Sequence, residues 1–259
     1  MATSDPTVKT TQAVDETGSG TDRILQTRNL RKQFGGLTAT DDVDFAVEAG
    51  ELRCLIGPNG AGKSTFLNLI TGVLEPTAGS IYYNGSDITD LESHKRVDRG
   101  ISIKFQVPSL YQEFTVRQNV RIPLQRVASS SEYESRTREI LQRCNLEGEI
   151  DTVASSLSHG QQQRLEIGMA MVLEPDLMLL DEPVAGLSVE ESADIAELLT
   201  SINETDGVAF IVIEHDIDFV ESIADRVTVL HQGGIFTEGT IEDVRADPDV
   251  KRIYLGEEH

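Results

Sequence analysis

Lysine and cysteine are scarce in this 259-residue chain, and both scarcities limit what the protein can be. The chain holds 22 basic residues against 44 acidic ones, which gives a formal net charge of -22 at pH 7. Lysine occurs only at positions 9, 32, 63, 95, 104 and 251. Because nucleic-acid binding requires a basic face, we exclude DNA and RNA as partners.

Many carboxylates with few lysines, spread along the chain, are typical of proteins from a salt-rich cytoplasm. High salt screens the self-repulsion that such a charge would otherwise cause. We therefore expect a halophilic protein, with an ordinary acidic protein as the alternative.

The two cysteines, Cys54 and Cys144, lie in a strand-like and a helix-like segment. We expect two reduced thiols in a cytoplasmic protein, and no metal-ligand spacing is present. No apolar run approaches the ~18 residues of a membrane span. Residues 1–22 lack the basic cluster and apolar core of a secretory signal, and their Thr, Ser, Asp and Gly content predicts a disordered tail.

Strand-like and helix-like segments alternate after this tail. Strands are expected over 24–34, 40–57, 177–183, 208–216 and 226–233. Between about 106 and 160 the spacing becomes helical and the composition more charged, which predicts a helical insertion. The alternation indicates an α/β fold with a parallel sheet that is covered on both faces.

A glycine-rich stretch, "GPNGAGKST", carries the pattern G-x-x-x-x-G-K-S between an apolar run and a helix-like segment. This context is typical of a loop that binds nucleotide phosphates. Backbone N–H groups of residues 58–64 can point at phosphate oxygens, Lys63 can reach the β- and γ-phosphates, and Ser64 can coordinate Mg²⁺. The residues expected to bind the nucleotide here are Gly57, Asn59, Gly60, Ala61, Gly62, Lys63, Ser64 and Thr65.

A second chemical element follows the apolar run "LMLL", which delivers Asp181 and Glu182 at its carboxyl end. Open α/β sheets bind ligands at that edge. We expect Asp181 to hold Mg²⁺ and Glu182 to act as general base on the attacking water.

The stretch "LSHGQQQRLEIGMAM" (157–171) resembles the signature motif of ABC-transporter ATPases. The order of motifs matches that family too: glycine loop, Gln106, signature, "LLDEP" and His215, so that the resemblance covers about residues 24–256. Ser158 is an expected N-cap, and the first helical turn with Gly160 and Gln161 offers N–H groups to an anion. In the family this turn completes the ATP site of a second subunit.

The resemblance implies further roles. Gln106 would touch Mg²⁺ and the attacking water, His215 would contact the γ-phosphate, and Phe34 would stack on adenine, unless Phe34 is a core residue. Two positions depart from the family pattern: His159 stands where most signatures have Gly, and Ser188 stands where many relatives have Asp. The second departure puts a cross-subunit contact near Asp181 in doubt.

The fold implied is a P-loop NTPase core of the ABC type over residues 23–259. It would contain a small antiparallel β-subdomain, a helical subdomain at about 106–160 and a C-terminal tail at about 241–259. The cofactors would be ATP and Mg²⁺. Two ATP-binding subunits, as a homodimer or heterodimer, would sandwich ATP on the inner face of the cell membrane.

Transport partners follow from the same resemblance. Separate permease subunits would bind near residues 106–114, and a solute-binding protein would take part indirectly. Motifs such as "VTVLHQG" and "DPDVKRIYLGE" are most similar to the urea-importer ATP-binding subunit. We therefore expect urea uptake. The branched-chain amino acid importers are the alternative, and an exporter, a non-transport ABC ATPase or a non-hydrolysing regulator fits less well.

Overall fold

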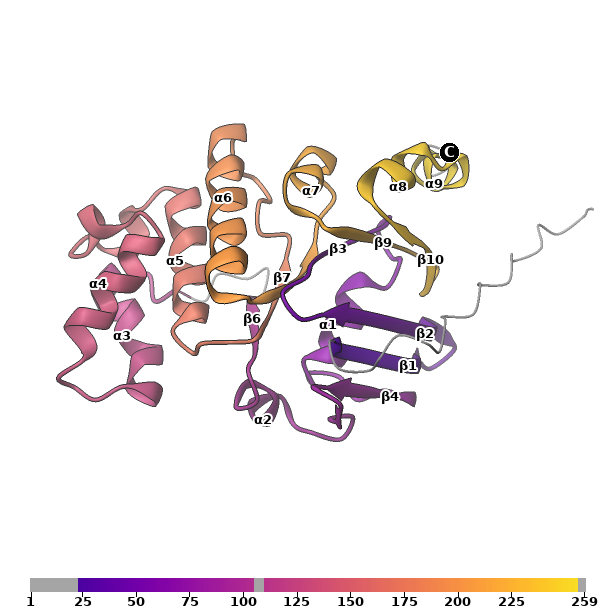
Figure 1. Ribbon diagram of the computed structural model, residues 1–259, viewed down its shortest axis with the longest axis horizontal. Helices are drawn as coiled ribbons and strands as arrows, with labels where there is room; N and C mark the ends of the chain where they lie inside the picture. Colours follow the sequence, from indigo (N-terminus) through magenta and orange to yellow (C-terminus); the bar gives the residue numbers. More distant parts are fainter. Residues whose placement is uncertain (1–22, 105–109, 256–259) are drawn as a thin grey trace, which may run out of the picture.

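The computed structural model describes residues 23–104 and 110–255 and contains two sheets (Figure 1). The antiparallel sheet has the strand order β2-β1-β4-β5. Its strands are β1 (Arg23–Phe34), β2 (Leu37–Glu48), β4 (Ala78–Tyr83) and β5 (Ser86–Asp87). The predicted tail at 1–22 and Gln106 lie outside the described residues.

The second sheet has the order β10-β9-β3-β8-β7-β6 and is parallel except for the pair β9–β10. Its strands are β3 (Leu52–Ile56), β6 (Ile101–Lys104), β7 (Leu177–Asp181), β8 (Ala209–Ile213), β9 (Arg226–His231) and β10 (Gly234–Gly239). Strands β3, β7 and β8 are buried along their whole length, as expected for a parallel sheet with both faces covered.

Alternate side chains of the parallel strands enter two different cores. Cys54 and Ile56 of β3 belong to the core under helices α5 (His159–Met171), α6 (Val189–Asp206) and α7 (Ile217–Ile223). Leu55, between them, belongs to the core shared with α1 (Lys63–Ile70) and the antiparallel sheet. The predicted α/β fold with an antiparallel subdomain is confirmed.

The helical part of the chain consists of α3 (Val116–Val127), α4 (Tyr133–Arg143) and α5, with two short 3₁₀ turns between α4 and α5. Thr115 and Gln118 form a reciprocal capping box that begins α3. The α5 helix runs to Met171 and packs against α3, α4 and α6, so the helical packing continues past residue 160.

The C-terminal segment is helical rather than a simple tail. It forms α8 (Ile241–Ala246) and α9 (Pro248–Leu255), and Ile241, Val244 and Val250 are buried in the core under α7. Within residues 23–104 and 110–255, none of the helices is both long and apolar enough to cross a membrane.

A buried arginine ends the helix that follows the glycine loop. Arg96, on the short helix α2 (Ser93–Val97), is 1% exposed. It donates to the carbonyls of Leu69 and Ile70 at the end of α1, at 2.8 and 2.7 Å, and to two further backbone carbonyls. Burial lowers the pKa of Arg96 to about 10. A charged donor at this position satisfies carbonyls that the helix end leaves unpaired.

Candidate active site

Three of the predicted motifs, namely the glycine loop, the acids after β7 and His215, follow strands that end at one edge of the parallel sheet. Strand β3 leads into the glycine loop, β7 ends at Asp181, and β8 ends at Ile213, directly opposite Asp181. Strand β3 lies beside β8, with Leu55 opposite Ile213. The carboxyl ends of parallel strands share one edge, so the glycine loop, the two acids and His215 follow neighbouring strands.

Glycine is required at both ends of the loop because other chain segments lie against its backbone. A Cβ atom on Gly57 would lie 2.2 Å from the Leu230 carbonyl oxygen, and one on Gly62 would lie 2.3 Å from that of Ala39. Both residues have positive φ angles, +149° and +103°. The loop therefore lies between β9 and β2, and the N–H of Gly233, in the turn after β9, donates to the Ala61 carbonyl at 3.0 Å.

The loop also holds its own lysine. Lys63 Nζ donates to the carbonyls of Gly57 and Pro58 at 2.5 and 3.1 Å, which places a cation over the loop. The first turn of α1, with Ser64 and Thr65, contains no acidic residue. Backbone N–H groups, a lysine and the positive end of a helix together suit a phosphate group. A magnesium ion bound with such a phosphate takes most ligands from phosphate and water. Ser64 and Asp181 stay its predicted protein ligands.

The acids at the end of β7 occupy different environments. Asp181 is 9% exposed, whereas the Glu182 side chain is 27% exposed. His215 Nδ1 lies 3.9 Å from Glu182 Oε1. Glu182 has a left-handed backbone conformation, with φ +49°, that few non-glycine residues adopt. The structure thus brings the predicted base and the predicted histidine together.

The signature turn is formed as the sequence predicted. Ser158 Oγ accepts from the N–H of Gln161, and the Gln161 side chain accepts from the N–H of Ser158, which makes a capping box at the start of α5. The buried residues of α5 belong to the core on the face of the sheet opposite α1. The helix that follows the phosphate loop and the helix that follows the signature turn therefore pack against different cores of the same chain.

Sequence reasoning missed Glu191, which joins the signature to the segment after β7. Glu191 Oε1 accepts from Ser158 Oγ and the Gly160 N–H, each at 3.2 Å, and Oε2 accepts from the Ser188 N–H at 3.1 Å. These backbone bonds, that from Ser188 first, lower the pKa of Glu191. The spacing S-x-x-E from Ser188 was the available signal, since it predicts a capping box.

Phe34 is 45% exposed, which excludes the alternative that it is a core residue. Lys32 Nζ lies 5.2 Å from the centre of its ring. An exposed ring at the end of β1 is free to accept a flat partner on one face. Its predicted contact with adenine stays a prediction.

Glu214 is the second residue that sequence reasoning missed. It follows β8 and precedes His215, where an acid resembles an ordinary solvated strand end, yet it is 0% exposed. No signal in the linear sequence distinguishes a buried acid at this position from a solvated one.

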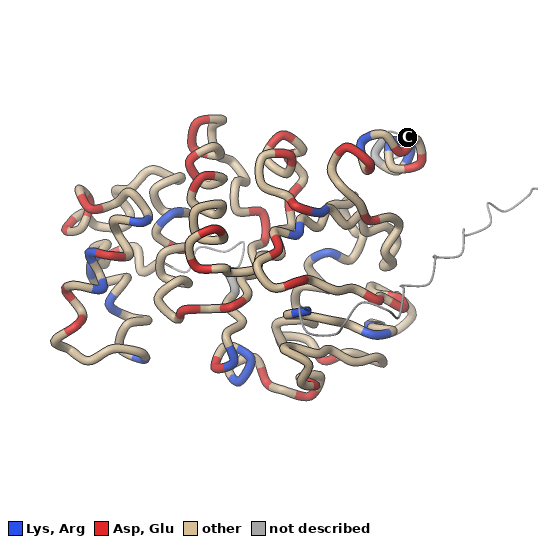
Figure 2. The backbone as a smooth tube through the Cα atoms, in the orientation of Figure 1, with Lys and Arg blue, Asp and Glu red and all other residues tan. Residues whose placement is uncertain are grey.

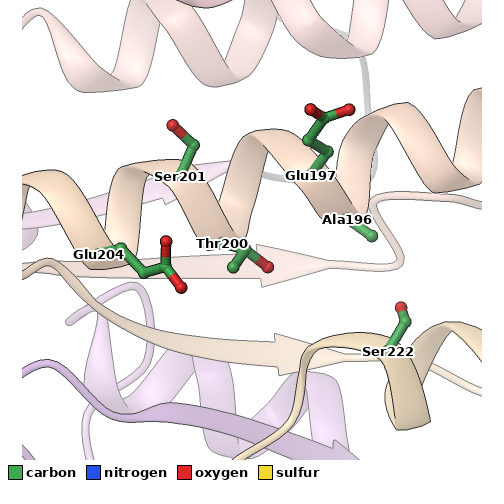
Figure 3. A pocket seen from close by; sticks show the side chains of 6 residues that line it. All are labelled: Ala196, Glu197, Thr200, Ser201, Glu204 and Ser222. Carbon is green, nitrogen blue, oxygen red and sulfur yellow. The ribbon is translucent and has the colours of Figure 1, made fainter.

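A shallow hollow lies elsewhere, between α6 and α7 (Figure 3). Glu197, Glu204 and three hydroxyl residues line it, together with Ala196. This lining provides carboxylates rather than N–H groups or a lysine, so it does not suit a nucleotide. The glycine loop lies at the surface, and its N–H groups and lysine, rather than a deep cavity, identify it as the phosphate site.

A phosphate loop between a parallel strand and a helix, with two acids and a histidine on neighbouring strand ends, defines a P-loop ATPase. The family model described as "ABC transporter" matches residues 40–185. The chain is 36% identical to the high-affinity branched-chain amino acid transport ATP-binding protein BraF of Pseudomonas aeruginosa, over 90% of this chain and 98% of that protein. It belongs to the ABC transporter family, as an ATP-hydrolysing cassette.

Two solved structures agree with this assignment. The ADP conformation of MJ1267, an ATP-binding cassette of an ABC transporter, has a TM-score of 0.83 and 34% identity, over 90% of this chain and 99% of that one. A dimeric post-hydrolysis state of the cassette MJ0796, bound to ADP and Pi, has a TM-score of 0.75 and 30% identity, over 84% and 98%.

Proposed function

We propose that this chain hydrolyses ATP to energise the import of branched-chain amino acids through separate permease subunits. The observation that carries the proposal is the 36% identity to a branched-chain amino acid transport protein over nearly the whole of both chains. The expectation of urea uptake was drawn from short motifs. The comparisons favour the alternative, import of branched-chain amino acids, and urea uptake becomes the competing hypothesis in the test below.

The chemistry proposed for the site follows from its geometry. Bound ATP and Mg²⁺ supply the reacting phosphoryl group and neutralise its charge. Lys63 and the loop N–H groups would hold the phosphates, and Ser64 and Asp181 would provide oxygen ligands near the ion. Gln106, which lies outside the described residues, is added as a ligand by the family resemblance alone. Glu182 accepts a proton from the attacking water, and His215 lies close enough to contact the γ-phosphate.

The proposed working form is a dimer with ATP between the two chains. Gly160 offers an N–H group and Ser158 a hydroxyl at the start of α5, opposite the face that carries α1. Both donors are bonded to Glu191 Oε1 in the single chain, and a phosphate from a second chain would replace that carboxylate oxygen as their acceptor. The dimeric ADP-bound relative supports this arrangement.

An exposed aromatic pair within the predicted region, residues 106–114, supports permease binding. Tyr111 and Phe114 are 55% and 41% exposed, and their rings stack with centroids 5.2 Å apart. We propose that this pair receives a permease segment, which would place the protein on the cytoplasmic face of the cell membrane. A solute-binding protein would take part only through the permeases.

Uptake by a deletion strain tests the solute. We expect loss of labelled-leucine uptake at micromolar concentration, with urea uptake retained, and restoration by the parent gene. A Glu182→Gln gene is the matched control, because it supplies a folded subunit without turnover. Loss of urea uptake with leucine uptake intact would reject the amino-acid assignment and leave the ATPase assignments unchanged.

A further inference from the structure

Glu214 is a fully buried carboxylate between the two loops that carry Glu182 and His215. It is 0% exposed, although it lies only one residue beyond β8. Its Oε1 accepts the N–H of Val184 at 3.0 Å, and its Oε2 accepts the N–H of His215 at 3.1 Å. One carboxylate therefore binds the backbone of both loops.

The bond to Val184 acts on the turn that presents the proposed general base. Glu182 has φ +49°, and such a conformation persists only where the surroundings hold it. Two contacts with the end of β8 do so: the Glu182 N–H donates to the Ile213 carbonyl at 2.9 Å, and Val184 donates to Glu214.

The bond to His215 acts on the other loop. Besides accepting the backbone N–H, Glu214 Oε2 lies 3.7 Å from His215 Nδ1, while Glu182 Oε1 lies 3.9 Å from the same atom. Two carboxylates thus face one edge of the imidazole. The buried one is held by backbone N–H groups, and the other is the proposed base.

Stability alone does not account for a carboxylate at this position. Burial raises the pKa of Glu214, while the N–H groups of Val184 and His215 act in the opposite direction. A carboxyl whose pKa is higher in the folded than in the unfolded chain loses its contribution to stability as the pH rises through the folded value. Folding therefore disfavours the charged form of Glu214 despite these two N–H groups, and the two loops that its carboxylate joins point to a role in positioning.

We propose that Glu214 is a positioning residue, which sets the place of Glu182 relative to His215 during ATP hydrolysis. Misplacement of a reacting group by about 1 Å can cost on the order of 100-fold in rate. Removing one carboxylate oxygen of Glu214 would release one of the two loops, and removing both oxygens would release the loop of Glu182 and the loop of His215 together.

The test compares Glu214→Gln and Glu214→Ala with the parent in purified form. Glu51→Gln is the matched control, because Glu51 is also a buried carboxylate that accepts a backbone N–H, but it precedes β3. ATP turnover is expressed per mole of protein that binds nucleotide, so that unfolded protein does not count. We expect Glu214→Gln to lower kcat by about tenfold or more, with KM for ATP within about twofold.

Thermal unfolding separates positioning from stability. We expect Tm of Glu214→Gln to stay within about 3 °C of the parent, and Glu51→Gln to lower Tm while keeping kcat. Glu214→Gln added to His215→Ala should lower kcat by a smaller factor than it does in the parent, because the two residues act together. A kcat of Glu214→Gln within about twofold of the parent, or an equal factor in both backgrounds, would overturn the proposal. Neither result depends on which solute is transported.

Discussion

Glu182 is the residue on which the proposed reaction depends most directly. It follows the buried strand β7, lies 3.9 Å from His215 and can accept a proton from water. We expect Glu182→Gln to bind ATP normally and to lose turnover by about 10²–10⁴-fold, because glutamine cannot accept that proton. Steady-state hydrolysis and nucleotide binding by the same sample measure both effects. Turnover within about twofold of the parent would assign the base to another group.

Gly62 shows that the phosphate loop has no room for a side chain where it packs against β2. An alanine there would meet the Ala39 carbonyl at 2.3 Å, whereas at Gly85, with φ +72°, no atom lies within 4 Å. Both substitutions force a left-handed conformation, which costs about 1–2 kcal/mol. We expect Gly62→Ala also to displace the loop and to weaken ATP binding by about tenfold or more. Gly85→Ala, the control, should bind ATP normally in a titration.

At the scale of elements, α1 depends on a side chain from another helix. Arg96 donates to the carbonyls that end α1, and it is buried. We expect Arg96→Met to lower the free energy of unfolding by about 3 kcal/mol or more, since charge-assisted hydrogen bonds each contribute about 1.5–3 kcal/mol. Exposed Arg99→Met should change it by less than about 0.5 kcal/mol. Equal changes in the free energy of unfolding for the two variants, measured by urea denaturation, would contradict the capping role of Arg96.

The N-terminus of α5 is expected to act between chains. Glu182→Gln protein should form a dimer with ATP and Mg²⁺, because retained ATP can join the glycine loop of one chain to the signature of another. Adding Ser158→Ala should weaken this dimer. Thr115→Ala removes an equivalent capping box from α3 and serves as the control. Size-exclusion chromatography with and without ATP is the measurement, and a monomer at saturating ATP would contradict the sandwich.

At the scale of the whole molecule, negative charge dominates. Acidic residues recur along α6 and at the outer turns (Figure 2), and α6 contains no lysine or arginine. We expect Tm to rise between dilute and molar potassium chloride, because the Debye length falls from about 10 Å at 0.1 M to about 3 Å at 1 M. Replacing exposed Glu197 and Glu204 by Gln should reduce this dependence. A constant Tm would reject the halophilic assignment.

Local patterns in the sequence were enough to predict the parallel sheet, the glycine loop and the Ser158 cap of α5. The buried run of β3 predicted its strand, although Arg53 interrupts it. Its charge is satisfied by Glu51 and by Glu238, which is 185 residues away. Glu214 and Arg96 were missed for the same reason: their partners are distant backbone groups, and backbone groups have no signature in a sequence.

The core under α5, α6 and α7 is continuous from the helical part of the chain to the parallel sheet. It includes Val116 and Val120 of α3 as well as Met178 and Leu180 of β7. Close-packed interiors are stiff and transmit strain over their whole extent. In mechanical terms, the helical part is rigidly coupled to the parallel sheet through this shared core. Within the described residues, a displacement at Tyr111 and Phe114 is expected to be transmitted through this core to the strand that ends at Asp181.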